Sequence, residues 1–124
     1  MKLRINGNSI RLRLSQSEVA KFQADGRVSS RLDIPGHALE YSLISDSAAQ
    51  TIGAEMDGSM IVRVPTRDAS QWASTDEVGL SNEQDIGDGK ILKILIEKDF
   101  TCLVPRAGED DADTFPHPKA AGAK

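Results

Sequence analysis

The stretch that decides the predicted fold is residues 9–34, which read SIRLRLSQSEVAKFQADGRVSSRLDI. Across residues 10–14 apolar and arginine side chains alternate, which is the period-2 pattern of a strand with one buried and one solvated face. Ser15 and Glu18 then form a capping box, which predicts that a short helix begins there. Gly26 ends that helix, and a second strand follows it. The stretch therefore predicts the order strand, helix, strand.

A second copy of the pattern begins about fifty residues later, and self-similarity at a fixed offset is typical of an internal repeat. The matched positions are residues 7–9 with 57–59, Phe22 with Trp72, and Val28 with Val78. Both turn segments favour positive φ, so each is expected to close a hairpin between two strands. Each half therefore reads ββαββ, over residues 2–44 and 51–97. We predict that the halves superpose about an approximate two-fold, with Phe22 and Trp72 in equivalent core positions.

Short connections between successive elements favour an α+β fold that is mostly antiparallel β, because hairpins join neighbouring strands and no crossover of ordinary length is present. The duplicated ββαββ units, with two short helices, are expected to form either an eight-stranded barrel or two packed four-stranded sheets. Thr66 is expected to cap the second helix. Residues 1–103 make one domain in this interpretation, and residues 104–124 form an acidic, proline-containing tail whose last residues are expected to be disordered.

Composition places the chain among ordinary globular proteins. The 124 residues are 39% hydrophobic, carry a net charge of −4 and include a single cysteine, so no internal disulfide is possible. With no spanning apolar run and no apolar signal region, we expect a soluble cytoplasmic protein that does not enter a membrane. The net negative charge argues against a general nucleic-acid binder. Residues 1–36 are nevertheless locally basic, with seven Lys or Arg against three acids.

Three segments carry a resemblance to a known family: KLRINGNSIRLRLSQSEVAKF, LKILIEKDFTCLVPR and EDDADTFPHP. Over nearly the whole chain they resemble a family of small uncharacterised bacterial proteins known as a domain of unknown function, and this resemblance implies no activity. In architecture alone the chain is similar to triphosphate tunnel enzymes, whose repeated strand-helix units form a barrel with Arg, Lys and Glu pointing inward. Their Glu-x-Glu-x-Lys signature is replaced here by KLRIN at residues 2–6. That departure removes the carboxylates expected to hold a catalytic metal, and it counts against a triphosphatase.

Basic side chains on the polar faces of the predicted strands form the main candidate site. Arg11 and Arg13 are two residues apart on one strand, so both project to the same side, and Arg4 lies across the hairpin from them. Arg63 is the repeat-related counterpart of Arg13. Guanidinium groups that converge on one surface bind anions through forked hydrogen bonds. The predicted ligand-binding residues are Arg4, Arg11, Arg13, Arg63, Lys93 and Glu97. In a competing interpretation the face is solvated, and Glu40, Glu55 and Glu97 neutralise the cations in cross-strand ion pairs.

The C-terminal region offers weaker candidates for a metal site. Its potential ligands are Cys102, Glu109, Asp110, Asp111, Asp113 and His117. They mix ligands preferred by Ca²⁺ or Mg²⁺ with ligands preferred by Zn²⁺, and no recognised spacing is present. We therefore expect a solvated acidic segment docked by Phe115, with no metal and no cofactor. Cys102 with His37 or His117 lacks any local signature of a cysteine enzyme, so no catalytic residue is assigned.

Two classes of function remain open at this point. The favoured hypothesis is a small binding module for an anionic, phosphate-type ligand on the arginine-rich face or tunnel. The alternative is a structural or protein-interaction protein without a small-molecule ligand, which includes a homo-oligomer. A metal-dependent phosphohydrolase is the third hypothesis, and we expect a binding protein rather than an enzyme.

Overall fold

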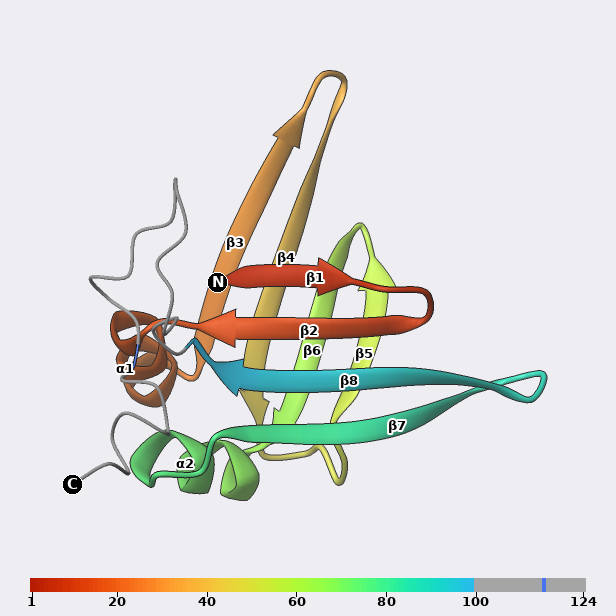
Figure 1. Ribbon diagram of the computed structural model, residues 1–124. Coiled ribbons are helices and arrows are strands. Elements are labelled where there is room, and N and C mark those ends of the chain that lie inside the picture. The colour runs from red at the N-terminus through yellow and green to blue at the C-terminus, as the bar shows by residue number, and fades with distance from the viewer. Residues whose placement is uncertain (100–114, 116–124) are drawn as a thin grey trace, which may run out of the picture.

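The computed structural model describes residues 1–99 and residue 115, which contain eight strands and two helices (Figure 1). The first half of the chain consists of β1 (Lys2–Ile5), β2 (Ser9–Leu14), α1 (Gln16–Asp25), β3 (Arg27–Ile34) and β4 (His37–Asp46). The second half consists of β5 (Gly53–Asp57), β6 (Ser59–Pro65), α2 (Thr66–Ser74), β7 (Gly79–Gly87) and β8 (Lys90–Lys98). The expected ββαββ order is therefore present in each half.

The strands form two packed four-stranded sheets and do not close into a barrel. Sheet A has the order β1-β2-β8-β7, and sheet B has the order β3-β4-β6-β5, so each sheet takes one hairpin from each half. The α+β class with two packed sheets is confirmed. The pairing is mostly antiparallel, as expected, but β2 pairs with β8, and β4 with β6, in parallel. These pairs join strands from opposite halves, and the short connections that indicated hairpins carry no information about them.

The two sheets correspond to one another strand by strand. Exchanging β1 with β5, β2 with β6, β3 with β7 and β4 with β8 converts the order and the pairing directions of sheet A into those of sheet B. The register agrees as well. The row of paired residues Leu3, Leu12, Ile96 and Leu80 in sheet A corresponds to the row Ala54, Val62, Leu43 and Val28 in sheet B.

This register corrects one matched pair from the sequence. Val28 occupies the place of Leu80 rather than that of Val78, because the connection between α2 and β7 is longer than the one between α1 and β3. Val28 is 3% exposed, whereas Val78 is 41% exposed. Of these two valines, only Val28 reaches the core.

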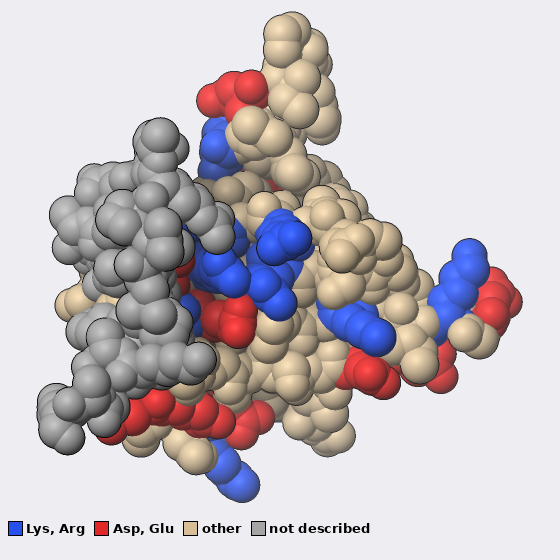
Figure 2. All heavy atoms as spheres, in the orientation of Figure 1, with Lys and Arg blue, Asp and Glu red and all other residues tan. Residues whose placement is uncertain are grey.

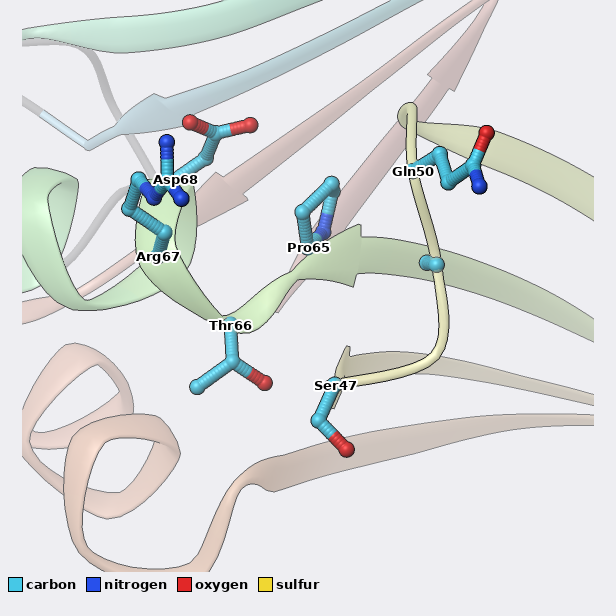
Figure 3. Close-up of a pocket in the computed structure, with 7 residues that line it drawn as sticks. Ser47, Gln50, Pro65, Thr66, Arg67 and Asp68 are labelled. Atoms are coloured by element: carbon cyan, nitrogen blue, oxygen red, sulfur yellow. The ribbon is translucent and has the colours of Figure 1, made fainter.

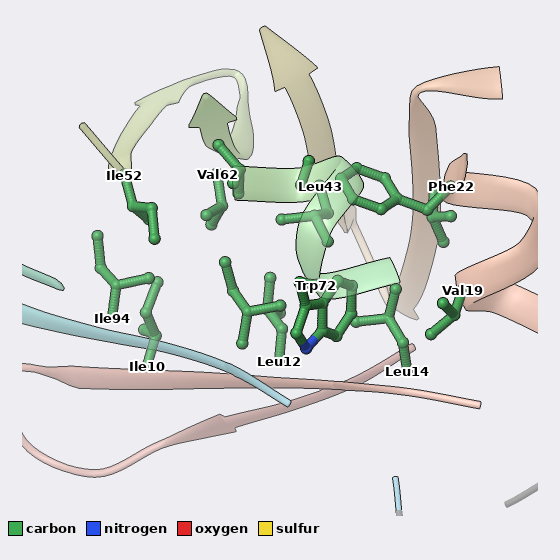
Figure 4. Close-up of a cluster of buried hydrophobic side chains, with 14 of the residues drawn as sticks. Ile10, Leu12, Leu14, Val19, Phe22, Leu43, Ile52, Val62, Trp72 and Ile94 are labelled. Carbon is green, nitrogen blue, oxygen red and sulfur yellow. The ribbon is translucent and has the colours of Figure 1, made fainter. Parts of the chain in front are cut away.

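The core lies between the inner faces of the two sheets and is closed at one end by both helices (Figures 1 and 4). Alternate residues of the central strands β2, β8, β4 and β6 supply most of it, as the period-2 pattern requires. Phe22 of α1 and Trp72 of α2 are both buried, and their rings meet edge to face with centroids 6.1 Å apart. Aromatic pairs favour this arrangement, so the two helices are anchored on each other as well as on the sheets.

The two helices begin differently. Ser15 and Glu18 form the expected capping box at α1, and Gly26 ends that helix with a φ of 73°. Thr66, however, is the first residue of α2 rather than its cap. Pro65 holds the cap position and makes no side-chain hydrogen bond there. Proline is tolerated at a helix start because the first backbone N–H groups have no intrahelical partner in any case.

Glu18 also makes an ion pair with the ammonium group of Met1. Burial alone would raise the pKa of Glu18, but hydrogen bonds from the Met1 ammonium and from Ser15 outweigh burial and hold its pKa below the ordinary value of 4.5. A carboxyl group with a lowered pKa in the folded state stabilises the fold above its unfolded pKa, and this contribution is lost as the pH falls through the folded value.

Glu18→Gln is therefore expected to lower the free energy of unfolding by about 1 kcal/mol at neutral pH, a value kept small because the group is partly exposed. The difference between wild type and variant should shrink as the pH falls below 4.5. Urea unfolding of both proteins across that range measures it. A difference that stays constant with pH would contradict the ion pair.

Candidate functional site

Five basic side chains gather on the outer face of sheet A: Lys2, Arg4, Arg11, Arg13 and Lys93 (Figure 2). We call this set the basic face. Its position follows from the strand pattern, because Leu12 and Leu14 point into the core and are 0% exposed, so Arg11 and Arg13 must point outward. Arg4, Arg11, Arg13, Lys93 and Glu97 lie on one face, as the sequence predicted.

Strand register places like charges directly opposite one another on this face. Lys2 of β1 pairs with Arg13 of β2, and Arg4 pairs with Arg11. Side chains at such positions start from Cβ atoms only about 4.5–5.5 Å apart. Opposed like charges destabilise a strand pair unless acids or a bound anion offset them.

Carboxylates offset only part of this charge. Glu97 lies opposite Arg13, and its Oε1 is 3.3 Å from the Nε of Arg11 and 3.7 Å from the Nε of Arg13. Asp99 lies 2.9 Å from the Nζ of Lys2, and Glu83 is paired in register with Lys93. One glutamate is thus shared by two guanidinium groups. Within residues 1–99 and 115, Arg4 has no ion pair, so the face keeps a positive surplus although the chain as a whole carries −4.

A depression of about 160 Å³ lies on this face, toward the turn end of the β1–β2 hairpin. It is lined by Arg4 and Arg11 and by Asn6 and Ser9, which form the next row of the same hairpin. Two guanidinium groups, one amide and one hydroxyl can all donate hydrogen bonds, which is what a tetrahedral oxyanion accepts. Sequence reasoning missed Asn6 and Ser9. Their spacing was the available signal, since each lies two residues from an arginine of the pair.

Arg63 does not belong to the basic face, which corrects the sequence-based grouping. It lies on the outer face of sheet B, where its Nε donates to Glu55 at 2.6 Å and its Nη1 to Asp46 at 3.3 Å. The hydrogen bond to Glu55 is the main cause that raises the pKa of Arg63. Glu40 and Glu55 are both in sheet B, where they pair with Arg27 and Arg63, so of the three glutamates expected to neutralise the arginines only Glu97 does so on the basic face. Ion pairing therefore accounts for Arg63 but not for Arg4.

A second depression, of about 380 Å³, lies where the connection after β4 passes the start of α2 (Figure 3). Its lining includes Arg67 and Asp68, whose opposite charges are adjacent, together with Ser47, Gln50, Pro65 and Thr66. Figure 3 shows Thr66 and Ser47 directed away from Arg67 and Asp68. The lining groups thus do not converge on a single point, and the basic face is the better candidate.

The proposed metal ligands Asp110, Asp111, Asp113 and His117, with Cys102 and Glu109, lie outside the described residues, as does the expected disorder of the last residues. Within residues 1–99 and 115, no group of three or more His, Cys, Asp or Glu side chains is arranged to hold a metal ion.

Phe115 is docked on the domain as expected. Its backbone N–H donates to the carbonyl of Asp99 at 2.7 Å, and its ring packs against the core. The Nζ of Lys98 lies 5.7 Å from this ring and 5.8 Å from that of Trp72, and it donates to the carbonyl of Thr75. Burial lowers the pKa of Lys98, while Asp76 and Glu77 oppose that shift. The lysine is thus held by aromatic faces and a carbonyl, away from the basic face.

Comparison with known proteins agrees with the resemblance seen in the sequence. The model of a family of unknown function (DUF7009) matches residues 1–119, and the chain belongs to that family. No curated protein and no solved structure is detectably similar to the chain. Neither helix of the described part has the length and apolar content needed to cross a bilayer.

Proposed function

We propose that this chain is a small binding module for an anionic, phosphate-type ligand held on the basic face. The observation that supports this most directly is the pair Arg4 and Arg11, which are opposed across the β1–β2 hairpin and line one depression with Asn6 and Ser9. Two like charges about 4 Å apart repel by about 1 kcal/mol in water. Glu97 pairs with Arg11, but no described carboxylate pairs with Arg4, so a bound anion would relieve the remaining repulsion.

Divergence between the two sheets supports the same assignment. We infer that the halves descend from one ββαββ unit, because the strand orders and registers correspond row by row. In the row of sheet B that corresponds to Arg4 and Arg11 stand Glu55 and Ile61. The cationic pair is therefore a property of one sheet rather than of the repeated unit, as expected for residues retained for a ligand.

The test is binding of inorganic phosphate, sulfate, polyphosphate and nucleotides at low salt, followed by calorimetry and thermal unfolding. At least one of these anions should stabilise the wild type, with an effect that grows with ligand concentration and weakens with added salt. Replacing both Arg4 and Arg11 by glutamine should weaken binding by at least about tenfold, because each lost charge-assisted hydrogen bond contributes about 1.5–3 kcal/mol.

Arg63→Gln is the matched control, since Arg63 occupies the strand position of Arg13 in the other sheet. Its anion affinity should equal that of the wild type. If none of these anions stabilises the wild type, or if the Arg63 variant loses affinity as the double variant does, the proposal fails.

A further inference from the structure

Strand β1 forms one edge of sheet A, and part of its backbone has no hydrogen-bond partner among residues 1–99 and 115. Asn6 and Ser9 exchange both of their backbone hydrogen bonds, at 3.0 and 3.1 Å. Because such pairs alternate along an antiparallel ladder, the N–H and C=O groups of Leu3 and Ile5 must point away from β2. The Met1 carbonyl points the same way and accepts a hydrogen bond from the Tyr41 hydroxyl at 2.9 Å. Within the described residues, the outward groups of Leu3 and Ile5 accept and donate none.

Strand β5, which takes the same place at the edge of sheet B, is capped by side chains. The Oε1 atom of Gln84 accepts from the N–H of Ala54 at 2.8 Å, and its Nε2 donates to the carbonyl of Ala54 at 3.2 Å. Asn82 donates in the same way to the carbonyl of Ile52 at 2.6 Å. The amide of Gln84 thus imitates one residue of an additional strand.

The equivalent corner of sheet A lacks this cap. Strand register places Leu32 of β3 where Gln84 lies in β7, and Leu3 where Ala54 lies in β5. A leucine side chain offers no hydrogen bond, and Leu32 is 51% exposed. Ile34 on the same side of β3 is 54% exposed, and Ile5 at the end of β1 is 63% exposed. The open edge is therefore bordered by apolar side chains that are about half exposed.

A strand added to β1 would extend sheet A beyond its free edge. The β3–β4 hairpin extends well past β1 (Figure 1), so a strand added to the free edge of β1 would lie over the inner face of that hairpin. Side chains of such a strand alternate between its two sides. Those opposite Leu3 and Ile5 would face Leu32 and Ile34, and those opposite Lys2 and Arg4 would join the basic face.

We propose that the edge of β1 binds an extended segment of a partner protein in which acidic and apolar residues alternate. Main-chain hydrogen bonds to Leu3 and Ile5 provide the pairing, as in other cases of strand addition to a sheet edge. Acidic side chains of the segment meet Lys2 and Arg4, and apolar ones cover Leu32 and Ile34. This site overlaps the anion depression at Arg4 and at no other residue named here.

A second copy of the chain is a poorer occupant. Pairing β1 with β1 brings Lys2 and Arg4 of the two copies against each other, and the repulsion between these like charges opposes association. Basic residues on edge strands are also a common protection against such pairing. Charge thus favours an acidic partner over self-association.

The test uses the full chain and a short synthetic peptide in which glutamate and valine alternate, with binding followed by fluorescence anisotropy. Saturable binding is expected. Leu32→Gln, which introduces the amide that caps the other edge, should weaken binding by about tenfold or more, because this amide would occupy the N–H and C=O of Leu3 that otherwise pair with the peptide. Leu32→Met keeps an apolar side chain and should bind as the wild type does. The same peptide with methylated backbone nitrogens should not bind.

Several results would overturn the inference. No binding of the glutamate-valine peptide would mean that Lys2 and Arg4 serve only to protect the edge. Equal binding of a lysine-valine peptide would refute the acidic chemistry of the partner, and concentration-dependent dimerisation abolished by Leu32→Gln would make a second copy the occupant. Phosphate titration of the Leu32→Gln variant keeps the two sites distinct, since it should bind anions as the wild type does whatever the peptide result.

Discussion

Trp72→Ala is expected to lower the free energy of unfolding by about 3–5 kcal/mol, the largest effect of any single change considered for this protein. Trp72 is 0% exposed and packs edge to face on Phe22. Its Nε1 also donates to the carbonyl of Val78 at 3.1 Å, at the end of the connection from α2 to β7. Truncation therefore leaves a cavity, separates the two helices and removes a hydrogen bond. Urea denaturation monitored by circular dichroism measures the loss.

Two further variants separate these contributions. Trp72→Phe keeps an aromatic ring but removes the donor to Val78, and it should lower stability by about 1–3 kcal/mol. Phe22→Ala removes the partner ring from α1 and should approach the effect of Trp72→Ala. If Trp72→Ala lowered stability by less than about 1 kcal/mol, the helix pair would not be part of the cooperative core.

The elements that the sequence predicted correctly are those encoded by near neighbours. The capping box of Ser15 and Glu18, the left-handed Gly26 and the alternation along β2 each depend on residues within one or two turns. The choice of Phe22 and Trp72 as core residues rests on the same local patterns. These features do not depend on which strands lie side by side, so they could be predicted without knowing the topology.

Strand pairing across the two halves could not be predicted in this way. The period-2 pattern tells which residues of a strand are buried, but not which strand is its neighbour. Arg13 and Arg63 do hold equivalent positions, as the sequence indicated, yet equivalent positions lie in different sheets because each sheet takes a hairpin from each half. The two arginines were grouped because they are equivalent in the repeat, and this equivalence is the reason that they lie on separate sheets.

The difference between the two edges was present in the sequence but had no meaning without the register. Positions 80, 82 and 84 of β7 face inward and read Leu, Asn, Gln, whereas the corresponding positions 28, 30 and 32 of β3 read Val, Ser, Leu. Polar amides on an inward face are a departure from strand patterning. Their role becomes clear only when the edge strand beside them is known.

Gln84→Leu gives β7 the residue that β3 has at the corresponding position, Leu32, and so removes the cap from β5. It is expected to lower the free energy of unfolding by about 2–3 kcal/mol. The N–H and C=O of Ala54 would lose their partners while remaining partly buried beside leucine. Unpaired polar groups at such a position cost more than the hydrogen bonds themselves contribute. Hydrogen exchange of the Ala54 amide, which is protected by Oε1 of Gln84, should accelerate in the variant more than that of any amide in β6.

Gln84→Glu is the sharper control because it keeps the size of the side chain. A carboxylate still accepts from the Ala54 N–H but faces the Ala54 carbonyl with an oxygen in place of the Nε2 donor, so half of the cap is lost and the loss of stability should be intermediate at neutral pH. Protonation below the ordinary carboxyl pKa restores a donor, and the Gln84→Glu variant should then recover toward the wild type while Gln84→Leu does not. If Gln84→Leu unfolds at the same urea concentration as the wild type and the Ala54 amide exchanges at the same rate, the amide does not cap this edge. The contrast between β5 and β1, on which the proposed binding of an acidic strand depends, would then lose its physical basis.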